Sequence, residues 1–300
     1  MRPFAALTRL ALAGLAAAAI GVGGQAGAQT KNETILFVGN SFTFGANSAV
    51  WKWHNNTVTD LNNGGVGGVP ALFKHFAEEA GLHYDVSLET VGGQGLDYHL
   101  ANKKPVLDKA WDHVVMHGYS TLDANNPGKP ELLVRTAAEA AAMFQAKNPR
   151  VDIHLTATWS RPDQTYVANR PWTGKPITAM NTDVRTAYDL AAAGSPYIRD
   201  VIPVGDAFMR ATSTGVADPN PYDGIAFGQV DLWTWDHYHA SAYGYYLEAL
   251  MVFGRLTGKD PLSLGPRETA AAELGISGPQ ATALQQVAHD ELAAYRGKGS

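Results

Sequence analysis

Three residues in this chain have the side chains that hydroxyl-based catalysis needs: Ser41, Asp236 and His239. Ser41 follows the apolar run TILFVGN, at a corner that would expose its hydroxyl beside backbone N–H groups. Asp236 and His239 are three residues apart, where the pattern predicts a helix start, and one helical turn would place them on the same face. A hydroxyl attacks when a base takes its proton, and a carboxylate can fix the tautomer of that base. The pattern therefore predicts attack by Ser41, with His239 as the base and Asp236 orienting it.

Two alternatives compete with this assignment. Ser and Asp are common helix-capping residues, so Ser41 and Asp236 could each be a cap. His237 is a second imidazole beside Asp236, and in a helix its side chain would diverge from that of His239 by roughly 200°. Only one of the two can then face Ser41, and His239 shares the face of Asp236. We therefore expect Ser41 Oγ at about 3 Å from a ring nitrogen of His239.

The elements that would position these residues alternate along the chain. Short, β-rich apolar runs are separated by longer segments with helical periodicity, which is typical of parallel βαβ units. The expected strands are Thr34–Gly39, Asp85–Val91, His113–His117, Val151–Ala157 and Asp200–Val204. The expected helices are Val69–Ala80, Glu131–Lys147, Thr178–Ala193, Ala240–Leu256 and one or two in Thr269–Tyr295. We therefore predict an α/β fold with a parallel five-stranded sheet in a single domain, residues 29–300, with a helical extension from about residue 265.

Polar and small residues follow most of the expected strands. In open α/β sheets, ligands bind beyond the carboxyl ends of the strands. Ser41, the glycines of 92–95, the segment 118–121, the segment 158–161 and the segment 235–239 all follow strands or precede the last long helix. The sequence therefore predicts that they meet at one rim of the sheet.

Composition excludes several kinds of protein. The 300 residues contain no cysteine, which rules out disulfides, cysteine zinc sites and thiol nucleophiles. The net charge of -5 argues against nucleic acid or an anionic membrane as the main partner. Residues 1–28 have a basic start, an apolar run and the small-residue end Ala26-Gly27-Ala28, as in a cleaved signal peptide. The apolar run is too short for a membrane span, so we expect a secreted or periplasmic protein without stable membrane insertion.

A catalytic metal is the main alternative use of the histidines. His237 and His239 form an H-x-H pair, but zinc needs three or four ligands. The other candidates lie at scattered spacings: His54, His99, His113, His117 and His154. We therefore expect neither a metal nor another cofactor. His117 could line the pocket or be packed inside, and Arg161 could contact substrate or form a surface salt bridge.

The ordered set of motifs resembles the SGNH hydrolases, also called the GDSL esterase/lipase superfamily. ILFVGNSFTFG is similar to their nucleophile block, and Asp236-His-Tyr-His239 matches their Asp-x-x-His block. The run from Ala240 to Leu247 and the segment from Val201 to Ala207 are also similar to the segments around that block. The resemblance implies a flavodoxin-like three-layer αβα fold and hydrolysis by a Ser-His-Asp triad without metal.

The same resemblance implies an oxyanion hole made by a Ser N–H, a Gly N–H and an Asn side chain. Ser41 matches the first directly, and Gly93, with Gly95 as the alternative, matches the second. The third position departs from the family, because Ser120 stands where the family has asparagine. A hydroxyl can still donate one hydrogen bond, whereas losing a donor typically costs about 10²–10³ in rate.

The aromatic residues suggest the substrate. Seven tryptophans are present, and Trp159, Trp233 and Trp235 are placed near the rim, where exposed rings could hold sugars or acyl groups and buried rings would pack the loops. We expect a secreted serine hydrolase that removes small acyl groups from glycans. A lipase or thioesterase for longer acyl chains is the alternative within enzymes. A non-catalytic glycan-binding protein on a hydrolase scaffold is the alternative outside them, motivated by the missing asparagine.

Overall fold

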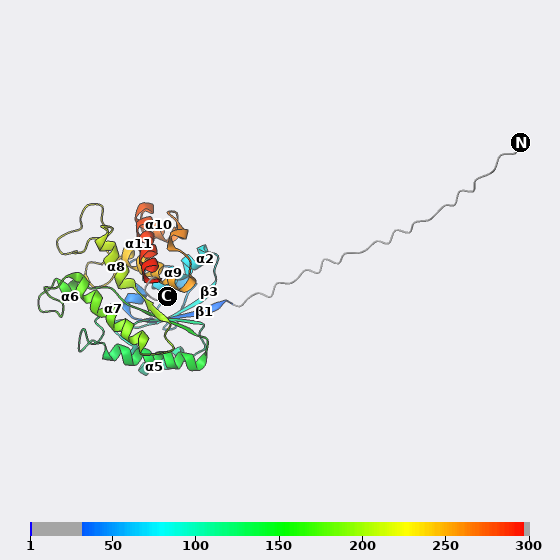
Figure 1. Cartoon of the computed structure of the whole chain (residues 1–300), viewed down its shortest axis with the longest axis horizontal. Coiled ribbons are helices and arrows are strands. Elements are labelled where there is room, and N and C mark those ends of the chain that lie inside the picture. Colours follow the sequence, from blue (N-terminus) through cyan, green and yellow to red (C-terminus); the bar gives the residue numbers. More distant parts are fainter. Residues whose placement is uncertain (2–31, 297–300) are drawn as a thin grey trace. The chain divides into compact units, whose positions relative to one another are not determined.

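A computed structural model of the chain describes residue 1 and residues 32–296 (Figure 1). The predicted signal peptide, residues 1–28, lies outside the described residues apart from Met1. From Asn32 onward the chain forms one compact unit. None of the helices within the described residues is long and apolar enough to span a bilayer.

The centre of this unit is a parallel sheet with strand order β2-β3-β1-β4-β5-β6. The sheet has six strands, not the five expected. The additional strand, β2, is only two residues long and pairs with β3 at the edge, so no apolar run marks it in the sequence. The strands are β1 (Glu33–Gly39), β2 (Thr59–Asp60), β3 (Tyr84–Thr90), β4 (His113–Met116), β5 (Asp152–Thr156) and β6 (Asp200–Ile202).

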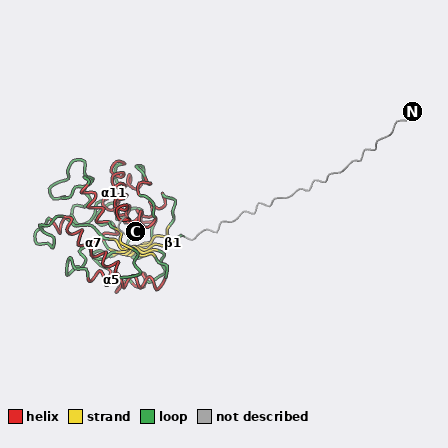
Figure 2. Tube along the Cα trace, viewed as in Figure 1, coloured by secondary structure: helices red, strands yellow, loops and turns green. Residues whose placement is uncertain are grey.

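Both faces of the sheet are covered, as the unalternating apolar strands predict. Along β1, Ile35 and Phe37 belong to one hydrophobic core, and Leu36 and Val38 belong to the other. Successive side chains of a strand point to opposite faces, so this division places one core on each side of the sheet. Figure 2 shows the yellow strands between α5 and α7 on one side and α11 on the other. The architecture is the predicted three-layer αβα sandwich.

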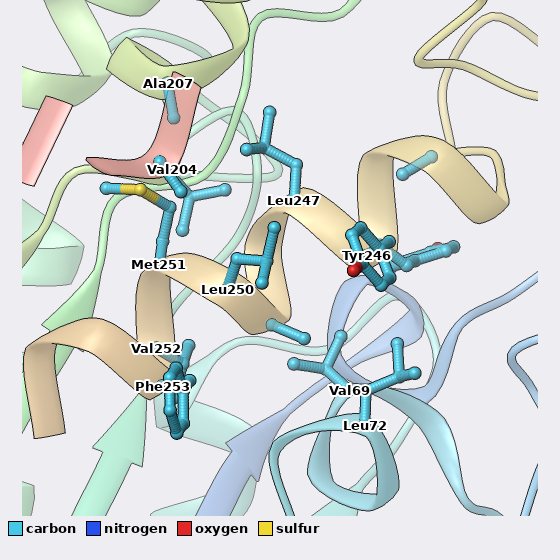
Figure 3. Close-up of a cluster of buried hydrophobic side chains, with 14 of the residues drawn as sticks. Val69, Leu72, Val204, Ala207, Tyr246, Leu247, Leu250, Met251, Val252 and Phe253 are labelled. Carbon is cyan, nitrogen blue, oxygen red and sulfur yellow. The ribbon is translucent and has the colours of Figure 1, made fainter. Parts of the chain in front are cut away.

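The first core lies under the helices that include the last long helix of the chain. These helices are α2 (Gly68–Glu79), α8 (Val204–Ser213), α9 (Ala242–Thr257), α10 (Thr269–Glu273) and α11 (Gly278–Arg296). Helix α9 is buried nearly all round, and Figure 3 shows its side chains between Val69 and Leu72 of α2 and Val204 and Ala207 of α8. At Gly254 a Cβ would stand 2.4 Å from Leu292 of α11, so a larger residue at this crossing would displace the Leu292 side chain.

The second core lies under α3 (Leu96–Asn102), α5 (Glu131–Lys147) and α7 (Ile177–Ala193). The long helices begin and end within two residues of the ranges that periodicity predicts. The remaining elements are short and lie in the connections. They are α1 (Ser41–Phe44), α4 (Lys104–Leu107), α6 (Pro162–Thr165), and the 3₁₀ turns η1 (Asn55–Thr57) and η2 (Pro261–Leu264).

Candidate active site

Ser41 is the first residue of α1, directly after β1 in the middle of the sheet. Asn40 caps this helix, because its side-chain oxygen accepts from Phe42 N at 3.1 Å. The amide nitrogen of the same side chain donates to Gln94 O at 2.9 Å and Gly118 O at 3.3 Å. Asn40 therefore joins the loops that follow β1, β3 and β4, as the rim prediction requires.

The Ser41 corner is fixed from below by two buried rings. Tyr245 of α9 donates its hydroxyl to Ser41 O at 3.1 Å and lies 3.3 Å from Ala46 O. His117 accepts from Thr43 Oγ1 at 2.8 Å through Nε2 and donates through Nδ1 to Gly118 O at 2.9 Å. Burial lowers the pKa of His117 to about 4, so the ring is neutral. Both nitrogens of His117 are used, which makes it a packed residue, one of its two predicted roles.

The Asp236–His239 segment differs from the helix start that its spacing suggested. Residues 234–239 form a turn closed by the antiparallel bridge between Trp233 and Ala240, and α9 begins only after Ser241. Thr234 N donates to His239 O at 2.8 Å across this turn. The three-residue spacing still brings the two side chains together, because a tight turn and a helical turn both fold residues i and i+3 toward each other.

Asp236 accepts hydrogen bonds through both carboxylate oxygens. Oδ1 accepts from Thr234 Oγ1, from Tyr238 N at 3.0 Å and from His239 N at 2.9 Å, and Oδ2 lies 2.6 Å from His239 Nδ1. Burial acts to raise the pKa of Asp236, but these hydrogen bonds outweigh it and hold the pKa well below its usual value. Asp236 is therefore a carboxylate at neutral pH that fixes His239 with its Nδ1 protonated.

His239 has its other ring nitrogen, Nε2, buried and without a hydrogen-bond partner among the described residues. Its ring lies 5.9 Å, centroid to centroid, from that of Phe42, the residue after Ser41. The expected hydrogen bond from Ser41 Oγ to His239 is not formed within the described part of the chain. His237 has a positive φ of 52° and its ring packs on Tyr222 at 4.1 Å, so it belongs to a different contact.

Asn47 is a site residue that the sequence did not reveal. Its amide nitrogen donates to Asp236 Oδ2 at 2.8 Å and lies 3.4 Å from His239 Nδ1. Asn47 has a positive φ of 59°, a conformation that asparagine tolerates better than most residues. Only this general preference for turns marks it in the sequence, because its contact with Asp236 spans 189 positions.

Besides Ser41, the residues assigned to the oxyanion hole lie in the two loops that follow β3 and β4. Gly93 is exposed and has a φ of +72°, a backbone conformation that favours glycine. Gly95, the alternative, is buried and directly precedes α3, where a Cβ would overlap the ring of Tyr119 at 2.3 Å. Ser120 is 7% exposed, and its Oγ accepts from Arg161 Nη1 at 3.1 Å.

The three tryptophans assigned to substrate binding divide into two groups. Trp159 is 0% exposed and stacks on Phe42 at 4.0 Å, and Trp233 is 1% exposed and donates Nε1 to Ser160 O. Both rings fill the core beneath the rim, so the expectation that they are exposed there is wrong. The position of both residues in loops suggested exposed rings, but these loops fold inward over the sheet. Trp235, directly before Asp236, is 78% exposed and keeps the surface that a substrate would need.

The histidines considered as metal ligands are dispersed among separate carboxylates. His54 pairs with Glu273, His99 with Glu89, and His154 with Asp200. Among the described residues, three His and Glu side chains have ligand atoms within 4.8 Å of one another, namely His75, Glu79 and Glu268. This group joins α2 to the turn before α10 and includes neither His237 nor His239.

No protein-family model matches the sequence, and no curated protein matches it either. Solved structures do match. A DUF4886 family protein from Bacteroides uniformis has a TM-score of 0.61 and 18% identity, covering 88% of this chain and 95% of that one. A putative GDSL-like lipase from Parabacteroides merdae has a TM-score of 0.52 and 18% identity, covering 76% and 96%. The resemblance to the SGNH hydrolases is therefore confirmed at the level of the fold.

Proposed function

We propose that the protein is a serine hydrolase that cleaves carboxylic esters. The observation that carries the proposal is the state of His239, whose Nδ1 lies 2.6 Å from Asp236 while its Nε2 is buried and unpartnered. An imidazole held in this tautomer has a basic nitrogen available for a proton. The ring lies 5.9 Å from that of Phe42, the neighbour of Ser41, which supports Ser41 as the source of the hydroxyl.

In the proposed reaction, Ser41 Oγ attacks the acyl carbon and its proton passes to His239 Nε2. His239 then protonates the leaving alcohol, and the acyl group stays on Ser41 as an ester. In the second half, water attacks this ester and gives up its proton to His239 Nε2. The bond between Ser41 Oγ and the acyl carbon then breaks, His239 returns the proton to Ser41 Oγ, and the acid leaves. Asp236 stabilises the imidazolium in both halves through Oδ2, which contacts His239 Nδ1. The N–H groups of Ser41 and Gly93 and the hydroxyl of Ser120 are assigned to the oxyanion.

The substrate class that we propose is a small acyl ester on a glycan. Trp235 exposes 78% of its surface directly before Asp236, and an exposed indole stacks well on a sugar ring. Tyr222, at 45% exposed, lies beside His237 of the same turn and extends the aromatic surface. Export by the leader of residues 1–28 is part of this proposal, because such substrates lie outside the cell.

Ser41→Ala tests the reaction. We expect the purified wild-type protein to hydrolyse p-nitrophenyl acetate faster than p-nitrophenyl palmitate, and the Ser41→Ala variant to lose about 10⁴-fold or more in kcat while keeping its melting temperature. Ser263→Ala, at an exposed serine of η2, is the matched control and should keep full activity.

Each other outcome points to one alternative. Preference for the palmitate ester would favour a lipase or thioesterase. A Ser41→Ala variant as active as the wild type would overturn the mechanism. A folded wild-type protein that binds acetylated oligosaccharides but hydrolyses neither ester would favour the non-catalytic glycan-binding protein.

A further inference from the structure

Arg161, in the loop after β5, is held by three groups at once. Its Nε and Nη2 donate to the two oxygens of Asp163 at 2.9 and 2.7 Å. Its guanidinium carbon lies 3.4 Å from the centre of the Tyr238 ring. The remaining nitrogen, Nη1, donates to Ser120 Oγ at 3.1 Å. The salt bridge predicted as one role for Arg161 is therefore present, but it leaves Nη1 directed at Ser120.

The direction of the Arg161–Ser120 hydrogen bond is fixed by chemistry. A guanidinium has donors only, so Ser120 Oγ must be the acceptor. This is the only hydrogen bond that Ser120 Oγ makes within residues 32–296, and its own proton therefore remains free to donate. A hydroxyl that accepts from a cation becomes a stronger donor, since consecutive hydrogen bonds polarise one another.

The surroundings make this effect larger than it would be in water. The Arg161 side chain is 11% exposed and Ser120 is 7% exposed, so solvent screens their contact only weakly. Two contacts place them beside the proposed site. Asn40 donates to Gly118 O in the Ser120 loop, and the Tyr238 ring lies 4.1 Å from that of His239.

We propose that Ser120 is the third oxyanion donor and that Arg161 is a positioning residue that orients and polarises its hydroxyl. This inference rests on the proposed ester hydrolysis. Together the two residues replace the asparagine amide that the family resemblance implies at position 120. A neutral amide donates through its own dipole, whereas here a serine donates under the influence of a fixed positive charge.

A double-mutant cycle in kcat tests the proposal, with p-nitrophenyl acetate as substrate. We expect Ser120→Ala to lower kcat by about 10²-fold, since it removes one donor from the oxyanion. Arg161→Gln should lower kcat by about 10-fold. Arg161→Lys should lower it by less, because lysine keeps the positive charge but lacks the several N–H donors of the planar guanidinium. In the Ser120→Ala background, Arg161→Gln should have almost no further effect, and KM should change little throughout.

Two further measurements separate this role from a structural one. In a Ser120→Asn background, the asparagine amide supplies its own donor, and Arg161→Gln should then change kcat very little. Affinity for phenylboronic acid, which forms a tetrahedral adduct with a serine, should fall with kcat in each variant. Arg135→Gln, at an exposed arginine of α5, is the matched control and should leave kcat, KM and the affinity for phenylboronic acid unchanged.

The outcomes distinguish this inference from the function on which it rests. If Arg161→Gln lowers kcat equally with and without Ser120, Arg161 acts through Tyr238 and His239, and the inference is overturned. A wild-type kcat in Arg161→Gln would also overturn it. If Arg161→Gln does not fold, Arg161→Lys in the two Ser120 backgrounds gives the same comparison. An active Ser41→Ala variant would instead refute the proposed function.

Discussion

Two aspartate–histidine pairs in this molecule have the same contact and different surroundings. His239 Nδ1 lies 2.6 Å from Asp236, and His154 Nδ1 lies 2.6 Å from Asp200. His154 Nε2 forms an ion pair with Asp152 at 3.2 Å, whereas His239 Nε2 has neither an ion-pair partner nor a hydrogen-bond partner among the described residues. A contact with aspartate is therefore not enough to make a histidine a base. Whether the second ring nitrogen has a partner decides whether the histidine is a structural ion or can accept a proton.

The electrostatics of the two pairs follow from this difference. Burial acts to lower the pKa of His154, but its two carboxylates outweigh burial and raise that pKa. Its ring is 2% exposed and bridges β5 to β6, with Arg255 of α9 on the far side of Asp200. The raised pKa favours the protonated, positively charged form of His154. His239 contacts one carboxylate only, that of Asp236, through Nδ1.

The largest expected effect is on catalysis, from Asp236→Asn. The asparagine oxygen can keep the backbone hydrogen bonds of the turn, but its NH₂ would face His239 Nδ1 and force the proton to Nε2. The base would then be in the wrong tautomer, and we expect kcat for p-nitrophenyl acetate to fall by about 10⁴-fold. Asp200→Asn, the matched change in the other pair, should leave kcat within a few-fold. A loss under tenfold in Asp236→Asn would contradict the assigned role.

The second expected effect is on stability, from His154→Gln. Removing one partner of a buried ionic cluster leaves the others uncompensated, which typically costs about 3–5 kcal/mol. We expect a loss of this size in the free energy of unfolding, measured by urea denaturation, with kcat unchanged in the folded protein. His239→Gln should show the reverse, an unchanged stability and a lost activity. Equal stability losses in the two variants would remove the distinction between the pairs.

The sequence predicts the fold well because the fold depends on local signals. Apolar runs and helical periodicity are repeated along each element, so the long helices and the main strands are found near their observed bounds. The edge strand β2 has two residues and no apolar pattern, since it is held by pairing with β3 and not by burial of its own side chains. Such an element exists only because its neighbour is in place.

The site is predicted less completely, because its geometry is non-local. The spacing of Asp236 and His239 indicates their contact even though the helix expected there is a turn. The contacts of Asn47 with Asp236 and of Arg161 with Ser120 join distant loops, and nothing in either segment alone indicates them. Burial of Trp159 and Trp233 likewise depends on how the loops fold over the sheet, which residue type cannot show.

The smallest expected effect is a pH dependence that separates the two pairs by stability alone. Burial tends to raise the pKa of Asp152, but hydrogen bonds and charge from His154 and Arg199 lower it to about 2. The pKa of Asp200 is also lowered, against burial, by His154 and Arg255. Carboxylates with depressed pKa values stabilise the fold above their unfolded value of 3.8 and lose this contribution as the pH falls. His154, with a raised pKa, contributes fully below its unfolded value of 6.5 and loses its contribution as the pH rises through the folded pKa.

The stability that His154 provides should therefore be greatest between about pH 4 and pH 6.5 and decrease on both sides. The measurement is the difference in unfolding free energy between the wild type and His154→Gln in urea, at steps from pH 4 to pH 9. Groups that titrate elsewhere cancel in this difference, and the ionisable neighbours that remain in both proteins are Asp152, Asp200, His113, Arg199 and Arg255. The same difference for His239→Gln is the control, since that variant is expected to keep the stability of the wild type. A His154→Gln difference that stays constant from pH 5 to pH 9 would mean that the pKa of His154 is the same in the folded and the unfolded protein, and the contrast between the two pairs would fail.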